Sequence, residues 1–218
     1  MNLSPVDIFN WIFALVLSLG VHEYAHARAA LVQGDTTAKD QGRLTLNPIA
    51  HIDLVGTVVL PLVLLFSSGM MFGWAKPVPV DPRRLRNQRY GYMMVAAAGP
   101  AANLVLCFLA ALVPPLWFSL SGDVPRGDHM LLELCRPLML INALLAVFNM
   151  LPVHPLDGGA VFAALLPDVL REKYERFVAP YGMFILLALM LGGGLHWVSG
   201  VAFGTIHVVQ LVVGLLVS

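Results

Sequence analysis

Long runs of hydrophobic residues, separated by short polar stretches, organise this sequence along its whole length. Five of the runs contain about 17 residues or more and few charges, which is the length that an α-helix needs to cross the hydrocarbon core of a bilayer. We therefore expect transmembrane helices at about Ile8–Val32, Tyr92–Leu120, Leu131–Leu151, Phe177–Val198 and Val201–Val217. The pattern predicts an all-α polytopic membrane protein.

A sixth hydrophobic stretch, Leu54–Phe72, is long enough to cross but is interrupted by glycine, proline and serine. Its pattern leaves open whether it crosses fully or enters and returns on the same side as a re-entrant segment. Two short loops between the runs, Gly42–Pro48 and Phe72–Val80, look extended, and roughly Ala160–Arg176 is amphipathic.

Composition supports a membrane protein independently of the pattern. Hydrophobic residues make up 58% of the chain and charged residues only 12%, with a mean hydropathy of +0.78. A soluble domain carries about twice that charged fraction. The formal net charge is zero, which argues against a nucleic-acid partner because such a partner needs a basic face.

No internal repeat and no separate soluble domain is visible in the sequence. We expect residues 1–218 to form one membrane-embedded domain, with its core at about 8–160 and C-terminal helices at 177–217. The two cysteines, Cys107 and Cys135, lie in hydrophobic runs without metal-binding neighbours, so we interpret them as packing residues and expect no disulfide.

The first hydrophobic run contains an H-E-x-x-H motif, His22-Glu23-Tyr24-Ala25-His26. In a helix the two histidines lie four residues apart on one face, which is the spacing that binds a single zinc ion. Glu23 then lies beside the metal, placed to take a proton from a bound water. An unpaired charge within an apolar helix costs about 3 kcal/mol on insertion scales, so the motif predicts zinc chemistry inside a membrane.

A second polar cluster follows the third full run, between Asn149 and Gly159. Pro152 and Pro155 prevent a regular helix there, and the two glycines after Asp157 let the backbone turn closely. Such a break can bring the Asp157 carboxylate into a cavity as a third zinc ligand, since two histidines, one acid and an open water position form the usual hydrolytic zinc site. Taken alone, the cluster fits a solvated loop aspartate equally well.

Three motifs in this order resemble the site-2 protease family of intramembrane zinc metalloproteases. They are H-E-x-x-H in an early span, Gly99-Pro100-Ala101-Ala102-Asn103 in a middle one, and N-x-x-P-x-x-x-L-D-G-G at the end of the next. The two extended loops are similar to those of the compact bacterial type without a PDZ domain. The resemblance covers roughly residues 15–160.

The resemblance implies one zinc ion per chain, held by His22, His26 and Asp157, with Glu23 as the catalytic base. It implies an intramembrane endopeptidase that hydrolyses peptide bonds in or near transmembrane segments of membrane proteins, within the lipid bilayer. The extended loops would pair with an unwound substrate by β-addition. The sequence leaves the substrate, any recruiting partner and the oligomeric state open.

Four further residues are candidates for the neighbourhood of the site. Asn103 and Asn149 match asparagines that the family places near its active site, as support for the transition state or the substrate. His154 stands where the family more often has an apolar residue or proline, so it either crowds the site or adds a hydrogen bond. His51 follows Pro48 and lies either near the site or at the interface.

Two other functions are compatible with a membrane zinc site. The first is a membrane zinc-binding or transport protein without protease activity, which needs ligands but no general base; Glu23 between the histidines weighs against it. The second is an inactive relative with a structural role, against which the intact motifs argue.

The position of the motifs also predicts how the chain crosses the bilayer. His22 lies about 21 Å along its helix, beyond the middle of a hydrocarbon core of about 30 Å. Asp157 follows the third full run, so it returns to the same side only if Leu54–Phe72 does not cross completely. We therefore favour five crossings and one re-entrant segment.

The basic residues test this arrangement. Nearly all of them then fall on the zinc-proximal side: Arg28, Lys39, Arg43, Lys76, Arg83, Arg84, Arg86, Arg89, Arg171, Lys173 and Arg176. Only Arg126 falls on the other side, and Arg136 lies within a span. By the positive-inside rule the zinc-proximal face is cytoplasmic. We expect a multi-pass protein of the bacterial cytoplasmic membrane with its N-terminus outside and its C-terminus inside.

Overall fold

The computed structural model describes residues 4–51, 53, 56, 59, 76–122 and 130–217, and every regular element within these ranges is a helix. The long helices are α1 (Pro5–Val32), α4 (Gln88–Ser121), α5 (Met130–Asn149) and α9 (His196–Val217). The shorter ones are α2 (Thr37–Asp40), η1 (Pro48–His51), η3 (Pro82–Arg84), α6 (Asp157–Leu165), α7 (Asp168–Lys173), η4 (Tyr174–Val178), η5 (Ala179–Tyr181) and α8 (Gly182–Leu191).

Five helical stretches in the described part are long and apolar enough to cross a membrane. They are Pro5–Val32, Gln88–Ser121, Leu132–Asn149, Asp168–Leu191 and His196–Val217. The expected all-α polytopic membrane protein is thereby confirmed. Almost all of Leu54–Phe72, and most of the Ser121–Met130 loop, lie outside the described residues.

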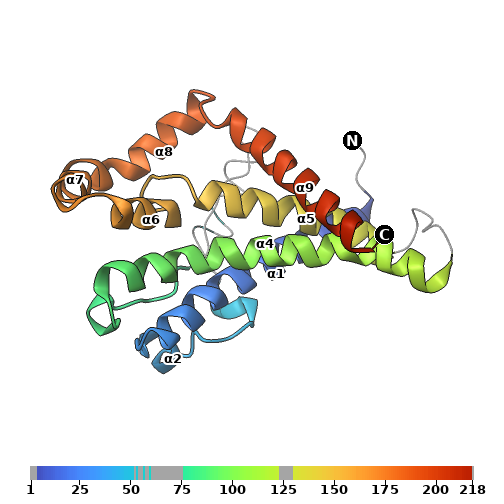
Figure 1. Cartoon of the computed structure of the whole chain (residues 1–218), viewed down its shortest axis with the longest axis horizontal. Helices are drawn as coiled ribbons and strands as arrows, with labels where there is room; N and C mark the ends of the chain where they lie inside the picture. The colour runs from blue at the N-terminus through green and yellow to red at the C-terminus, as the bar shows by residue number, and fades with distance from the viewer. Residues whose placement is uncertain are drawn as a thin grey trace.

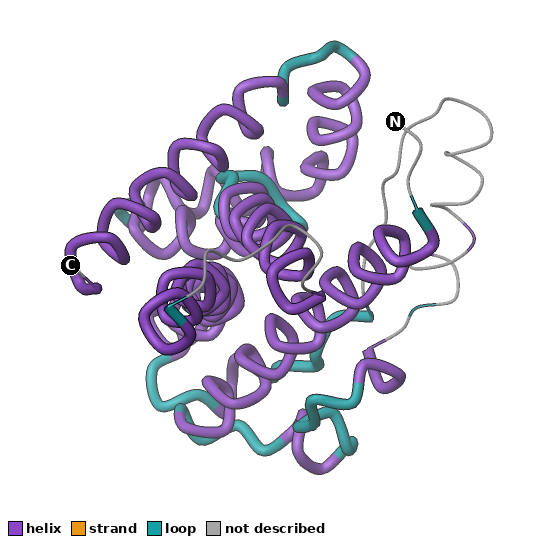
Figure 2. The backbone as a smooth tube through the Cα atoms, turned by 90° about the vertical axis from the view of Figure 1, so that its right-hand side faces the viewer, coloured by secondary structure: helices purple, strands orange, loops and turns teal. Residues whose placement is uncertain are grey.

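Helix α4 lies at the centre of the bundle and packs against α1, α5, α6 and α9 (Figure 1). The view along the long axis shows α4 and α5 nearly end-on, with α1 crossing beside them (Figure 2). The core between these helices is built largely from small side chains, among them Ala14, Cys107, Ala110, Ala143 and Ala202. Small residues let helices approach closely inside a membrane, where apolar burial alone gives little drive for association.

Both cysteines lie inside the bundle. Cys107 on α4 and Cys135 on α5 are buried. Their burial fits the packing role that the sequence predicts.

The fourth predicted span has different boundaries from those expected. We expected one helix over Phe177–Val198, but α8 ends at Leu191 and α9 already begins at His196. Three consecutive glycines make the break: Gly193 has a φ of 72°, in the left-handed region that favours glycine, and Gly194 N–H donates to Leu189 O. Hydrophobicity alone did not predict this turn because the residues on both sides of it are apolar.

The amphipathic stretch at roughly Ala160–Arg176 is also divided. Helix α6 starts earlier, at Asp157, and ends at Leu165, and α7 starts after Pro167. Proline cannot supply the N–H that would continue α6, so the chain turns there. The consequence is that Asp157 occupies the first turn of a short separate helix.

The end of α1 and the start of α4 lie side by side. Arg86 N–H donates to Gln33 O at 2.8 Å, and Asp81 N–H donates to Asp35 Oδ2 at 2.7 Å. Figure 1 shows α5 ending at this same end of the bundle, next to α6. The chain thus leaves α1, enters α4 and leaves α5 at one end, which brings the α1 and α6 motifs together.

The last two helices meet at a bend, and α9 ends toward the end of the bundle at which α1 begins (Figure 1). Helix α8 itself has 10 residues, and it is the last part of the 24-residue stretch Asp168–Leu191 that is long and apolar enough to cross a membrane. The side of the membrane on which the C-terminus lies stays a prediction.

Candidate metal centre

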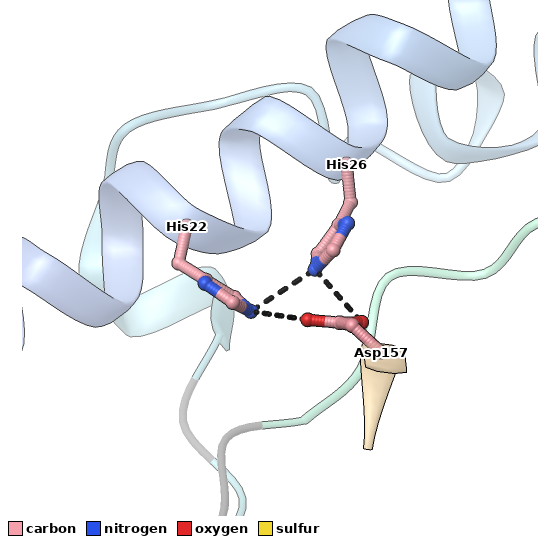
Figure 3. A group of neighbouring side chains, drawn as sticks. All are labelled: His22, His26 and Asp157. Carbon is pink, nitrogen blue, oxygen red and sulfur yellow. Dashed lines mark hydrogen bonds and ion pairs between the residues drawn. The ribbon is translucent and has the colours of Figure 1, made fainter. Parts of the chain in front are cut away.

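Three side chains that were predicted as metal ligands converge between α1 and α6. His22 and His26 project from the same face of α1, one turn apart, and Asp157 faces them from the start of α6 (Figure 3). His22 Nε2 lies 3.0 Å from His26 Nε2 and 3.2 Å from Asp157 Oδ2, and His26 Nε2 lies 3.4 Å from Asp157 Oδ1. Within the described ranges this is the one group of three such residues that could hold a metal ion.

The spacing of these atoms fits a zinc ion. Bonds of about 2.0–2.1 Å at a tetrahedral angle place neighbouring donor atoms about 3.3–3.4 Å apart, close to the three separations observed. Asp157 Oδ2 is moreover buried without a hydrogen-bond partner. A buried carboxylate oxygen is costly when nothing satisfies it, and a cation bound among the three groups would do so.

The outer ring nitrogens of both histidines are engaged by α4. His22 Nδ1 lies 2.6 Å from Asn103 Oδ1, and His26 Nδ1 lies 2.8 Å from Val95 O. A carbonyl oxygen only accepts hydrogen bonds, so each Nδ1 carries the proton and each Nε2 of a neutral ring keeps a lone pair. Metal-binding histidines are oriented in this way by outer partners, so both rings are prepared for a cation.

Gly99 on α4 gives the two imidazoles their space. A Cβ at this position would overlap His26 Nε2 and would lie 2.6 Å from His22 Cε1. Gly158 has a similar role beside the third ligand, because a Cβ there would overlap the backbone of Met150. The close approach of α4 to α1, and the turn that presents Asp157, therefore both require glycine.

Glu23 lies beside the ligand cluster on α1 and is buried, with 8% of its surface exposed. Its Oε2 accepts a hydrogen bond of 3.0 Å from Val78 N–H. The Lys76–Val80 segment, which contains Val78, has no regular secondary structure. The predicted base is thus close to the metal ligands and in contact with the end of one predicted extended loop.

The Lys76–Val80 segment is held in place from the other predicted loop. Lys76 N–H donates to His51 O at 2.8 Å, and Arg43 Nη2 donates to Lys76 O at 2.7 Å. The His51 ring is buried, with its Nε2 2.9 Å from Thr45 O. His51 therefore joins the loop structure next to the site and is not one of the three clustered ligands.

The other two candidate residues do not reach the cluster either. Asn149 Nδ2 donates to Leu145 O of its own helix at 3.0 Å. His154 Nδ1 lies 3.4 Å from the Tyr174 hydroxyl, which donates to Pro152 O. Burial lowers the pKa of His154, although the negative charge of Glu175 acts to raise it. The lowered pKa favours the neutral ring. His154 packs against Tyr174 and does not crowd the metal ligands.

Sequence reasoning missed several polar residues around the site. Ser18 and Asn142 are fully buried beside Asn103. Arg89, which the sequence analysis counts only among the basic residues of the zinc-proximal side, donates to Ala164 O and Leu166 O at the end of α6. The sequence does show a polar residue, Asn142, inside an apolar run. Its partner is on another helix, however, so its role depends on tertiary packing.

The sequence is similar to those of known peptidases. The sequence model of peptidase family M50 matches residues 125–192, which include Asp157. The "Putative zinc metalloprotease YwhC" of Bacillus subtilis is 36% identical over 198 residues, covering 88% of this chain and 87% of that protein. The "Putative zinc metalloprotease Rip2" of Mycolicibacterium smegmatis is 31% identical over 200 residues, covering 89% and 71%.

A more distant relative is the "Putative zinc metalloprotease sll0528" of Synechocystis, which is 25% identical over 206 residues. That match covers 94% of this chain and 42% of the relative. No solved structure matches the chain.

Proposed function

Because the chain belongs to peptidase family M50, the site-2 proteases, and is thus a zinc metalloendopeptidase, we propose that it cleaves membrane proteins within the bilayer. The observation that carries the proposal is the meeting of His22, His26 and Asp157. The two histidines, and Glu23 beside them, lie on α1, which is long and apolar enough to span a membrane. Its substrates would be transmembrane proteins cut in or near their membrane-spanning segments.

One zinc ion per chain would be held by the two imidazole Nε2 atoms and the Asp157 carboxylate. When bound, zinc supplies a Lewis acid that polarises a carbonyl group and lowers the pKa of water to about 7. The chain's residues prepare this site from two directions. Helix α1 carries two ligands and the base, and α6 carries the acid.

Glu23 would act as the general base and then as the general acid. Its carboxylate takes a proton from the attacking water and delivers it to the leaving amine of the cleaved peptide. The hydrogen bond from Val78 N–H holds Oε2, which orients the carboxylate and leaves Oε1 to exchange the proton. Proton transfer by a positioned side chain contributes about 10²–10⁴-fold to the rate of such reactions.

The Lys76–Val80 segment would support the substrate backbone. A transmembrane helix hides its carbonyl groups in its own hydrogen bonds, so a substrate must unwind before it is attacked. Pro77 and Pro79 lack backbone N–H groups, and Lys76 and Val78 already use theirs within the protein. A substrate strand beside residues 76–79 would therefore donate its own N–H groups to carbonyl oxygens of the segment.

We assign the zinc-proximal face to the cytoplasm of a bacterial cell. The charge distribution supports this orientation, since the loops next to α1, α4 and α6 carry most of the basic residues. The three relatives described above are bacterial proteins. The N-terminus would then lie outside.

Replacing Glu23 by glutamine tests the proposal against a transport function. The amide keeps the size of the side chain but removes the base, so Glu23→Gln should keep zinc and lose proteolysis of a reconstituted membrane substrate. Glu172→Gln, an exposed position on α7, is the matched control and should cleave like the wild type. Normal cleavage by Glu23→Gln would refute the mechanism. If the wild type showed no proteolysis and zinc flux was the same in the wild type and in Glu23→Gln, a transport function would be favoured.

A further inference from the structure

A chain of buried hydrogen bonds runs from the α5 backbone to the outer nitrogen of the His22 ring. His22 Nδ1 lies 2.6 Å from Asn103 Oδ1, and Asn103 Nδ2 donates to Asn142 Oδ1 at 2.7 Å. Asn142 Nδ2 donates to Ser18 Oγ and to Leu138 O, both at 2.8 Å. Ser18, Asn103 and Asn142 have no exposed surface. Three helices, α1, α4 and α5, thus meet through polar groups beside the metal ligands.

Backbone carbonyl groups fix the direction of every bond in this chain, because they accept hydrogen bonds and never donate them. Leu138 O requires the NH₂ group of Asn142 to face it. If the Asn142 amide were flipped, its oxygen would face Leu138 O and its NH₂ group would face the NH₂ group of Asn103. Neither pair could form a hydrogen bond. Ser18 O, 3.2 Å from Asn103 Nδ2, fixes the Asn103 amide in the same way. Each amide therefore presents its oxygen in the direction of His22.

The protonation of His22 follows from this direction. Because Asn103 presents an acceptor, His22 Nδ1 must carry the proton, and Nε2 of the neutral ring keeps the lone pair that faces Asp157. We infer that Asn142 is a positioning residue for the metal site, acting through Asn103 to fix the tautomer and orientation of His22. The inference rests on the proposed function, since it assigns His22 as a zinc ligand.

A second buried asparagine on the bundle shows that burial alone does not create this role. Asn10 on α1 is 2% exposed, and neither its Oδ1 nor its Nδ2 has a hydrogen-bond partner. Asn142, by contrast, uses both amide hydrogens and its oxygen. Losing Asn142 would leave the NH₂ group of Asn103 with only the longer bond to Ser18 O, so the amide that faces His22 would be held less firmly.

Asn142→Leu in the full chain tests the inference, with Asn10→Leu as the matched control. Two quantities are measured: the zinc dissociation constant, by competition with a chelator, and the His22 tautomer in metal-free protein, from ¹⁵N spectra of the imidazoles. Asn142→Leu should weaken zinc binding about 10–100-fold, the usual effect of losing an outer partner of a ligand. It should also mix the two His22 tautomers. Asn10→Leu should change neither quantity.

Ser18→Ala provides a milder second variant in case Asn142→Leu does not fold. It removes one of the two acceptors of Asn142 and should shift both quantities in the same direction by a smaller amount. Wild-type zinc affinity together with an unchanged His22 tautomer in either folded variant would overturn the inference. Wild-type protein that binds no stoichiometric zinc would instead overturn the proposed function, so the two failures are distinguishable.

Discussion

Gly99 on α4 lies against the imidazole of His26 on α1, so closely that a Cβ at position 99 would overlap Nε2 of that ring. The same Cβ would press on His22. The backbone of α4 therefore forms one wall of the ligand cluster, and only a residue without a side chain leaves room for both histidines.

Gly99→Ala should displace the two histidines and weaken zinc binding by about 100-fold or more, since changes outside the ligands themselves already cost 10–100-fold. Proteolysis should fall in parallel. Zinc content and cleavage of a membrane substrate are the two measurements. The control is Gly200→Ala on α9, where a Cβ meets open space and both quantities should stay at wild-type levels. Full zinc occupancy in Gly99→Ala would show that α4 does not limit the site as described.

Arg89 should influence the metal site from a distance through α6. Its guanidinium donates to Ala164 O at 2.8 Å and pairs with Asp168 at 2.6 Å. This ties α4 to the end of the helix that begins with Asp157. We expect Arg89→Met to lower zinc affinity about tenfold, measured by chelator competition.

Arg83→Met is the comparison for Arg89→Met. The Arg83 side chain is 84% exposed and pairs only with Asp81, two residues away. An exposed pair of this kind contributes little to stability because solvent screens it, so zinc affinity should not change. Equal effects of the two variants would mean that net charge, and not the anchoring of α6, governs the site.

Asp35 is a buried carboxylate that holds Asp81, the residue directly after the Lys76–Val80 segment. It accepts hydrogen bonds from Thr37 N–H at 2.9 Å and from Asp81 N–H at 2.7 Å. Burial by itself raises the pKa of Asp35, but the hydrogen bonds outweigh it and hold the pKa below the ordinary value. Asp35→Asn should therefore lower the free energy of unfolding by about 2–3 kcal/mol near neutral pH.

The pH dependence of this effect has a definite sign. A carboxylate with a lowered folded pKa stabilises the protein above its unfolded pKa of about 3.9, and this stability is lost as the pH falls through the folded value. The difference in unfolding temperature between wild type and Asp35→Asn should be full at pH 6 and shrink below about pH 4. Asp40→Asn, an exposed position on α2, should show little difference at either pH. A difference for Asp35→Asn that is independent of pH would contradict the role of the charge.

The orientation in the membrane can be tested by labelling single cysteines in a chain without the two native ones. Gln41→Cys and Arg84→Cys should both react from the cytoplasmic side, because the chain leaves α1 and enters α4 at one end of the bundle. Ser121→Cys, at the far end of α4, should react from outside. Opposite labelling of Gln41→Cys and Arg84→Cys would contradict both the charge argument and the adjacency of these ends.

The residues that could be predicted from sequence are those whose geometry is local. His22 and His26 share a face because the helix repeats every 3.6 residues, and no tertiary contact is needed for that. Asp157 needed the family resemblance, because a loop aspartate before glycine has many other uses. The helix break at Gly192–Gly194 was missed because apolar residues flank it on both sides.

The supporting residues could not be predicted, because their roles depend on how distant helices are rotated against each other. Asn142 meets Asn103 across 39 positions of sequence, and Asp35 meets Asp81 across 46. In sequence, Asp35 resembles an ordinary exposed loop acid, yet it is fully buried. Asn149 carried the family motif but bonds only to its own helix in the described structure.

X-ray absorption at the zinc edge, combined with metal content, tests the central claim most directly. The purified chain should hold one zinc per molecule, with nitrogen and oxygen ligands at about 2.0–2.2 Å and the signature of two imidazoles. The double variant His22→Ala, His26→Ala should lose the metal. Stoichiometric zinc that remains in this double variant would contradict the assignment of His22, His26 and Asp157 as the zinc site.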